Sequence, residues 1–140
     1  MAIVQTRLAR PPGGSTVFPH GDVYLAQGSE TGNVSETSLF QPDSRSNTGP
    51  IDTWQYREAV LITNCTSIGT GGATLAVKLY ACDSLGNRTG AALITKSITA
   101  TGSTRDAVTA PIGNYIDVTK TITSQTGGTT TCEVELQLKT

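Results

Sequence analysis

The clearest pattern in the chain is a two-residue alternation close to its C-terminal end. Apolar residues alternate there with charged and polar ones: Cys132, Val134, Leu136 and Leu138 against Glu133, Glu135, Gln137 and Lys139. A period of two places one set of side chains on a core and the other in water, as in a half-buried β-strand. Residues 115–122 show the same type of pattern, and glycines at 127 and 128 follow them. The sequence therefore predicts a β-hairpin over residues 115–140.

Earlier segments predict further strands. Residues 73–82 alternate in the same way and indicate a second half-buried strand. Residues 59–62 are apolar at successive positions, which is typical of a central strand that is covered on both faces. We therefore expect the N-terminal segment or a neighbouring subunit to lie over the outer face of this strand.

The region between these strands and the last hairpin is rich in turn residues. Residues 92–101 predict a strand with Ile94 and Ile98 on one side. A turn is expected at 102–106, followed by a short extended segment at 107–110.

Residues 1–53 differ from the rest of the chain in composition. They contain five of the six prolines, and 27–52 is a long polar stretch with few apolar residues. A segment so poor in apolar side chains cannot form a core of its own. We therefore predict an extended N-terminal arm with loops at residues 1–53, in which 3–8 and 17–26 form short strands, and a β-sandwich domain at residues 54–140.

The spacing of the strands and the composition indicate one fold class. Short strands follow one another at regular spacing with no helical period, and Thr and Ser make up a quarter of the chain. A chain of 140 residues is one domain by length. We predict an all-β protein with a single β-sandwich of antiparallel strands, Ig-like or jelly-roll-like, rather than a βαβ fold.

Charge and cysteine content narrow the function classes. Only 15% of the residues are charged and no run of Lys or Arg occurs, so the electrostatic footprint of a nucleic-acid binder is missing. No apolar stretch has the length of a signal peptide or a membrane span, so we expect a cytosolic protein without membrane contact. Cys65, Cys82 and Cys132 form no CxxC pair, which predicts free thiols and no zinc site, disulfide framework or cofactor.

Two sets of residues resemble fragments of active sites. His20 with Asp22 and a serine would supply a base and an orienting carboxylate, but no Gly-x-Ser-x-Gly elbow accompanies them and the neighbouring residues indicate a turn. Glu133 and Glu135, about 7 Å apart on one strand face, would suit acid–base chemistry or calcium. A solvated strand face whose charge discourages edge pairing is the commoner explanation. We therefore predict no catalytic residues, no metal site and no enzyme activity.

Trp54 and Tyr56 share one face of a predicted strand. Two aromatic rings placed in this way can stack on a sugar ring, although core or interface packing is the commoner role. They are the candidate ligand-stacking residues.

The order of these strands and turns resembles a small β-sandwich found in virion proteins of tailed bacteriophages. Residues 57–62 match one strand of that pattern and precede glycine-rich turns. Residues 73–84 match the next strand, and 115–118 lead through the glycine pair to an alternating last strand. The resemblance covers about residues 51–140 and leaves the N-terminal segment unmatched.

The resemblance carries functional expectations and shows one departure. Where the family often has a tryptophan after the turn near position 87, this sequence has Arg88, Thr89 and Gly90. Proteins of this family bind without catalysis. The resemblance implies a virion protein that decorates heads or builds tail parts. Of these we expect a head decoration (cement) protein that stabilises the assembled capsid, located on the outer surface of the virion after assembly in the host cytoplasm.

The expected partners are the major capsid protein and other copies of this chain, as a homotrimer, with no direct contact to nucleic acid or membrane. A partner would order the arm, which cannot fold alone. The expected contacts are the apolar residues of the arm: Ile3, Val4, Leu8, Val17 and Phe18, with Leu39 and Phe40 as a second anchor. Two alternatives stay open: a tail or neck component, and a carbohydrate- or receptor-binding virion module that uses Trp54 and Tyr56.

Overall fold

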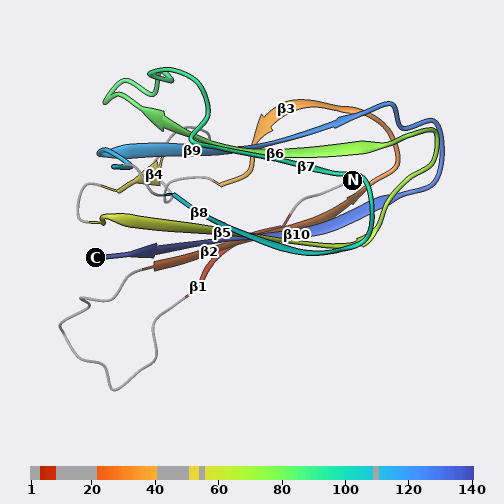
Figure 1. Cartoon of the computed structure of the whole chain (residues 1–140), viewed down its shortest axis with the longest axis horizontal. Coiled ribbons are helices and arrows are strands. Elements are labelled where there is room, and N and C mark those ends of the chain that lie inside the picture. The colour runs from red at the N-terminus through yellow and green to blue at the C-terminus, as the bar shows by residue number, and fades with distance from the viewer. Residues whose placement is uncertain (1–3, 9–21, 41–50, 54–55, 109–110) are drawn as a thin grey trace.

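The chain folds as two antiparallel β-sheets packed face to face (Figure 1). The computed structural model describes residues 4–8, 22–40, 51–53, 56–108 and 111–140. The described residues form ten β-strands and no helix, and so contain no helix that could cross a membrane. The predicted all-β sandwich is therefore confirmed.

The strands divide between the two sheets in an order that differs from their order in the chain. The first sheet has the order β1 (Val4–Leu8), β2 (Asp22–Glu30), β10 (Thr130–Lys139), β5 (Glu58–Ser67) and β8 (Gly102–Ala107). The second sheet has the order β3 (Val34–Ser38), β9 (Tyr115–Thr123), β6 (Thr74–Cys82) and β7 (Ile94–Ile98), with the short β4 (Ile51–Asp52) also paired to β9.

The core lies between the sheets and follows the alternation in the sequence. The strands at its centre bury every second side chain: Leu75, Val77 and Leu79 on β6, and Cys132, Val134, Leu136 and Leu138 on β10. Ile94 and Ile98 both reach this core from β7, as predicted. On β5 the outward-facing Val60 is only 6% exposed, while Ile62 is half-buried, so the outer face of this strand is also partly covered.

The predicted hairpin over residues 115–140 is wrong, because its two strands lie in opposite sheets. β9 pairs with β3, β4 and β6, whereas β10 pairs with β2 and β5. Each strand has one apolar face, and the two faces bury more apolar surface by packing against each other than by lying side by side. The turn between them therefore crosses from one sheet to the other, with positive φ angles of 61° at Ser124 and 70° at Gly128.

The predicted boundary at residue 53 does not separate an arm from the sandwich. β2 lies inside the first sheet between β1 and β10, and β3 and β4 belong to the second sheet. Tyr24, Leu39 and Phe40 are buried in the core, where the Tyr24 and Phe40 rings lie 5.8 Å apart. Residues 1–53 need few apolar side chains. Strands β9 and β10 from the rest of the chain supply hydrogen bonds to β2, β3 and β4, and most of the core comes from later strands. Residues 1–3, 9–21 and 41–50 of the predicted arm lie outside the described residues.

The turn predicted at 102–106 is wrong as well, because these residues belong to β8. β8 is an edge strand whose side chains are half-buried or exposed, so it needs little apolar content. Asp106 on β8 forms an ion pair with Lys96 on β7, with 3.8 Å between Asp106 Oδ2 and Lys96 Nζ. This pair links the two sheets at the side of the sandwich where their edge strands, β8 and β7, lie.

Candidate functional site

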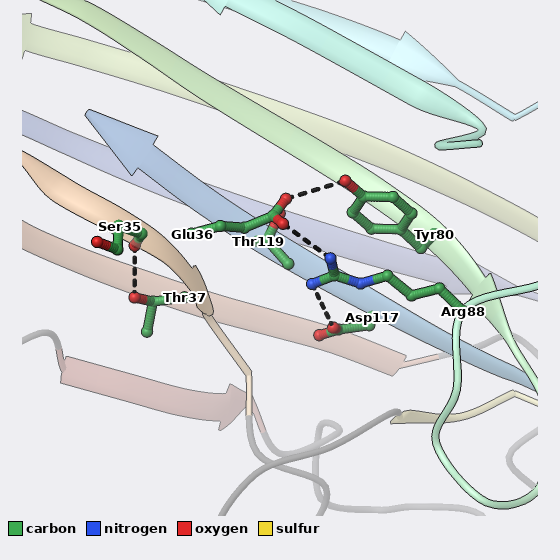
Figure 2. Close-up of polar contacts among 7 residues, drawn as sticks. All are labelled: Ser35, Glu36, Thr37, Tyr80, Arg88, Asp117 and Thr119. Carbon is green, nitrogen blue, oxygen red and sulfur yellow. Dashed lines mark hydrogen bonds and ion pairs between the residues drawn. The ribbon is translucent and has the colours of Figure 1, made fainter. Parts of the chain in front are cut away.

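A polar cluster lies on the outer face of the second sheet (Figure 2). Its side chains come from four separate segments: Glu36 from β3, Tyr80 from β6, Arg88 from the turn after β6, and Asp117 and Thr119 from β9. The register of β6 and β9 places Tyr80 directly opposite Asp117. Because side chains alternate along a strand, these residues point away from the core that their neighbours fill.

The turn after β6 positions Arg88. The carboxylate oxygen Asp83 Oδ1 accepts backbone hydrogen bonds from Asn87 and Leu85, each at 2.9 Å. These bonds, led by the one from Asn87, hold the pKa of the Asp83 carboxyl below its ordinary value. The turn brings Arg88 back beside the end of β6, where it forms an isolated β-bridge with Cys82.

Glu36 is the centre of the cluster because its carboxylate accepts three hydrogen bonds. Arg88 Nη1 donates to Oε1 at 2.7 Å, while the hydroxyls of Tyr80 and Thr119 donate to Oε2, each at 2.9 Å. Partial burial opposes ionisation, but the bonds from Arg88, Thr119 and Tyr80 outweigh it and lower the pKa of Glu36. Burial, together with the bond to Glu36, raises the pKa of Tyr80. At neutral pH the cluster therefore pairs a Glu36 anion with a neutral Tyr80 donor.

Arg88 covers the cluster from the solvent side. Its guanidinium carbon lies 4.1 Å from the centre of the Tyr80 ring, and Nη2 lies 3.4 Å from Asp117 Oδ2. Burial lowers the pKa of Arg88, but the bonds to Glu36 and Asp117 raise it by more. The Arg88 side chain keeps 37% of its surface exposed. The second oxygen, Asp117 Oδ1, is buried and has no hydrogen-bond partner in the described part of the chain.

This arrangement is suited to a rigid surface for contact with another molecule, rather than to proton transfer. Glu36 is fixed as an anion by three donors, so it is not a base whose pKa lies near neutral pH. A guanidinium stacked on a tyrosine ring is a contact group that is enriched in protein interfaces.

The sequence pattern did not predict a buried ion pair that lies inside the sandwich. Lys120 Nζ on β9 lies 3.0 Å from Glu30 Oε1 at the end of β2, and their side chains are 2% and 16% exposed. The pair joins the two sheets across the core. Lys120 lies on the same inward face of β9 as three buried apolar residues, Ile116, Val118 and Ile122. Its position in this two-residue alternation is the feature of the sequence that could have predicted its burial.

The predicted contact residues of the arm fall into three groups. Leu39 and Phe40 are 4% and 1% exposed, so the prediction that they anchor a partner directly is wrong for the closed sandwich. Val4 and Leu8 lie in β1 at the edge of the first sheet. The remaining three lie outside the described residues: Ile3, Val17 and Phe18.

The predicted ligand-stacking pair is not supported by the position of Tyr56. Tyr56 is 5% exposed and belongs to the core, so its ring is not a platform for a sugar. Trp54 lies outside the described residues, as does His20 of the candidate catalytic set.

The two acidic residues of the last strand have a different setting from the one predicted. Glu133 and Glu135 are half-buried on the outer face of β10, which is a central strand, so they do not guard an edge. Gln137 Nε2 donates a hydrogen bond to Glu135 Oε2 at 3.1 Å. Among the described residues, no three His, Cys, Asp or Glu side chains cluster so that they could hold a metal ion.

No family model matches the chain, and no curated protein or solved structure matches it. The fold, the surface chemistry and the resemblance of the strand pattern are therefore the basis for a functional proposal.

Proposed function

We propose that this chain is a non-catalytic structural protein of a tailed-bacteriophage virion that decorates the outer surface of the assembled capsid. The two-sheet sandwich supports this proposal because it is the fold that the strand resemblance implies. The proposed partners are the major capsid protein and other copies of this chain, arranged as a trimer at local threefold positions, after assembly in the host cytoplasm.

The observation that carries the proposal is the place of β1 in the first sheet. β1 pairs with β2 on one side, and no other described strand pairs with its second edge. An edge strand presents unpaired backbone N–H and C=O groups to which an extended segment of another chain can add. The N-terminal segment thus supports docking as a sheet edge, in place of the freely extended arm that its composition indicates.

The outer face of the first sheet extends this docking edge. Val23 and Leu25 on β2 are half-buried there, and the register places Leu25 opposite Glu135 and Glu135 opposite Ile62. Apolar side chains set among charged ones are the surface that non-obligate protein contacts use. We take this face and β1 together as the capsid-binding surface.

Binding of many copies would stabilise the capsid by mass action. A protein that binds only the assembled shell favours that state by RT ln(1+[L]/Kd), which is about 4 kcal/mol at a thousandfold excess over Kd. The effect repeats at each site on the shell. A cement role therefore needs no chemistry beyond specific contact.

The test is binding of the purified chain to empty expanded capsids, measured by co-sedimentation and by the melting temperature of the capsid. We expect the chain to bind and to raise that temperature, and a variant lacking residues 1–8 to lose binding while keeping a β-sheet circular dichroism spectrum. Thr95→Ala is the matched control, because it changes an exposed side chain of β7 in the opposite sheet and leaves β1 in place. Unchanged binding without residues 1–8 would contradict the role of β1. Binding to tails but not to heads would favour the tail or neck alternative.

A further inference from the structure

Two of the three cysteines lie directly opposite each other in the first sheet. Cys65 on β5 and Cys132 on β10 are in register, are 2% and 7% exposed, and carry free thiols. Residues opposite each other on antiparallel strands have Cα atoms about 4.5–5.5 Å apart, and a disulfide spans about 4.4–6.8 Å. An S–S bond between them is therefore compatible with the existing strand pairing.

The surroundings of the pair give its two sulfurs different roles. The hydrogen bond from Cys65 lowers the pKa of the Cys132 thiol, and the charge of Lys120 acts in the same direction, against the effects of burial and of Glu30. The same hydrogen bond, with burial, raises the pKa of the Cys65 thiol. Cys132 is also the more exposed of the two residues, at 7% against 2% for Cys65, so we take it as the first to meet an oxidant and Cys65 as the second to react.

We propose that Cys65 and Cys132 are a modification site, at which a peroxide oxidant closes a cross-strand disulfide. The Cys132 thiolate attacks one oxygen of hydrogen peroxide, the O–O bond breaks, and a sulfenic acid and hydroxide form. The Cys65 sulfur then attacks the sulfenic sulfur, the S–O bond breaks, and the thiol proton leaves with the oxygen as water. The hydroxide takes up the proton that Cys132 lost on becoming a thiolate, so the two thiols lose two electrons and two protons in total, and the peroxide is reduced to two water molecules.

Cys82 is the internal control for this reaction. It is buried to the same degree as Cys132 but lies on β6 in the second sheet, where its paired residues are Tyr115 and Arg88. Burial, with the charge of Asp117, raises the pKa of the Cys82 thiol. It has neither a thiol opposite it nor a cation that favours its thiolate on balance, so it should stay reduced.

Peptide mapping tests the proposal directly on the full chain. The reduced protein is treated with hydrogen peroxide, the remaining thiols are alkylated under denaturing conditions, and trypsin then places each cysteine in its own peptide: 58–78, 79–88 and 121–139. We expect 58–78 to be linked to 121–139 with the loss of two hydrogen atoms, and 79–88 to be alkylated. The oxidised protein should melt roughly 5–15 °C higher than the reduced one, and a dithiol reductant should reverse the shift.

Alanine variants at each of the three cysteines identify which thiols form the bond. Cys82→Ala should form the same linked peptides, whereas Cys65→Ala and Cys132→Ala should not. Full alkylation of 58–78 and 121–139 after peroxide treatment would overturn the proposal, as would links to 79–88 in equal yield. The map of the unmodified sequence decides the outcome even if an alanine variant fails to fold.

The use of such a bond connects to the proposed function. A virion surface protein leaves a reducing cytoplasm at cell lysis and then meets oxidising surroundings, where the bond would add stability after assembly. This use rests on the proposed function, while the peptide map does not depend on it. A positive map with no capsid binding would therefore keep the disulfide and reject the capsid-decoration role.

Discussion

Strands β2 and β10 are neighbours in one sheet, but only the sequence of β10 shows by its alternation that one of its faces is buried in the core. The inward positions of β10 from Cys132 to Leu138 are all apolar. The opposite positions on β2 run from Tyr24 and Ala26 through a glycine to Glu30. The comparison shows that a strand can be central when only part of its inward face is apolar, provided that its neighbours supply the rest of the core.

The polar end of β2 is satisfied by contacts from other segments. Glu30 pairs with Lys120, and Gln125 Nε2 donates hydrogen bonds to the backbone oxygens of Glu30 at 2.9 Å and Gly32 at 3.2 Å. Thr130 donates its hydroxyl hydrogen to Gln125 Oε1. A Cβ at Gly69 would collide with this Gln125 side chain, so glycine is required there. β2 is thus held by apolar packing at one end and by a buried polar network at the other.

The largest expected effect comes from removing part of β2. A variant lacking residues 1–25 loses the beginning of β2, including Tyr24, and exposes the edge of β10. We expect it to be unfolded at room temperature, because a core strand without its neighbour leaves backbone groups and apolar side chains in water. Circular dichroism and amide exchange provide the measurement, and the variant lacking only residues 1–8 is the control. A folded 26–140 fragment would mean that β2 contributes little and that an arm is the better description.

The next effect tests the core face of β10. Leu136→Ala removes a side chain that is 0% exposed, and it should lower the free energy of unfolding by about 2–5 kcal/mol. Gln137→Ala, on the other face of the same strand, should change it by less than about 0.5 kcal/mol. Urea unfolding of both variants provides the measurement. Equal losses would show that the register of β10 is wrong.

The comparison of β2 with β10 also explains which strands could be predicted from the sequence. β6 and β10 were predictable because the period of their own side chains reveals a buried face. The pairing of β9 with β6 was not, because alternation reports which side of a strand is apolar and not which strand lies beside it. β8 and β3 were missed because edge strands with exposed faces need no apolar residues.

The polar cluster could not be predicted for a related reason. Glu36, Tyr80, Arg88 and Asp117 come from distant segments, and only the sheet order brings them together. Of these residues, the sequence singled out Arg88 alone, because the virion proteins that the strand pattern resembles often have a tryptophan after this turn. Leu39 and Phe40 resemble partner contacts in the sequence because their polar surroundings hide their place in the core.

The third effect tests the polar end of β2. Lys120→Met keeps most of the side-chain volume but leaves Glu30 without its cation, and we expect a loss of about 2–3 kcal/mol in the free energy of unfolding. The partial exposure of Glu30, 16%, limits the loss because water still reaches the carboxylate. Combining Lys120→Met with Glu30→Gln should recover part of it. The measurement is a double-mutant cycle by urea unfolding. Additive losses would show that the two side chains do not act as a pair.

The smallest effect concerns the exposed cluster on the second sheet. Arg88→Ala should lower the free energy of unfolding at neutral pH by about 1 kcal/mol. The Arg88 and Glu36 side chains are 37% and 30% exposed, so their ion pair contributes little, while Asp117, at 12%, loses its contact with the guanidinium. The pKa of Glu36 lies below its ordinary 4.5 in the folded protein, so the stability it contributes is present above pH 4.5 and is lost as the pH falls through the folded value. The unmodified protein and the variant should therefore become equally stable in acid, as urea unfolding across this pH range would show. If the difference in free energy of unfolding between the two proteins stays constant with pH, Arg88 stabilises the fold by packing on Tyr80. The charges of the polar cluster would then contribute nothing beyond that contact.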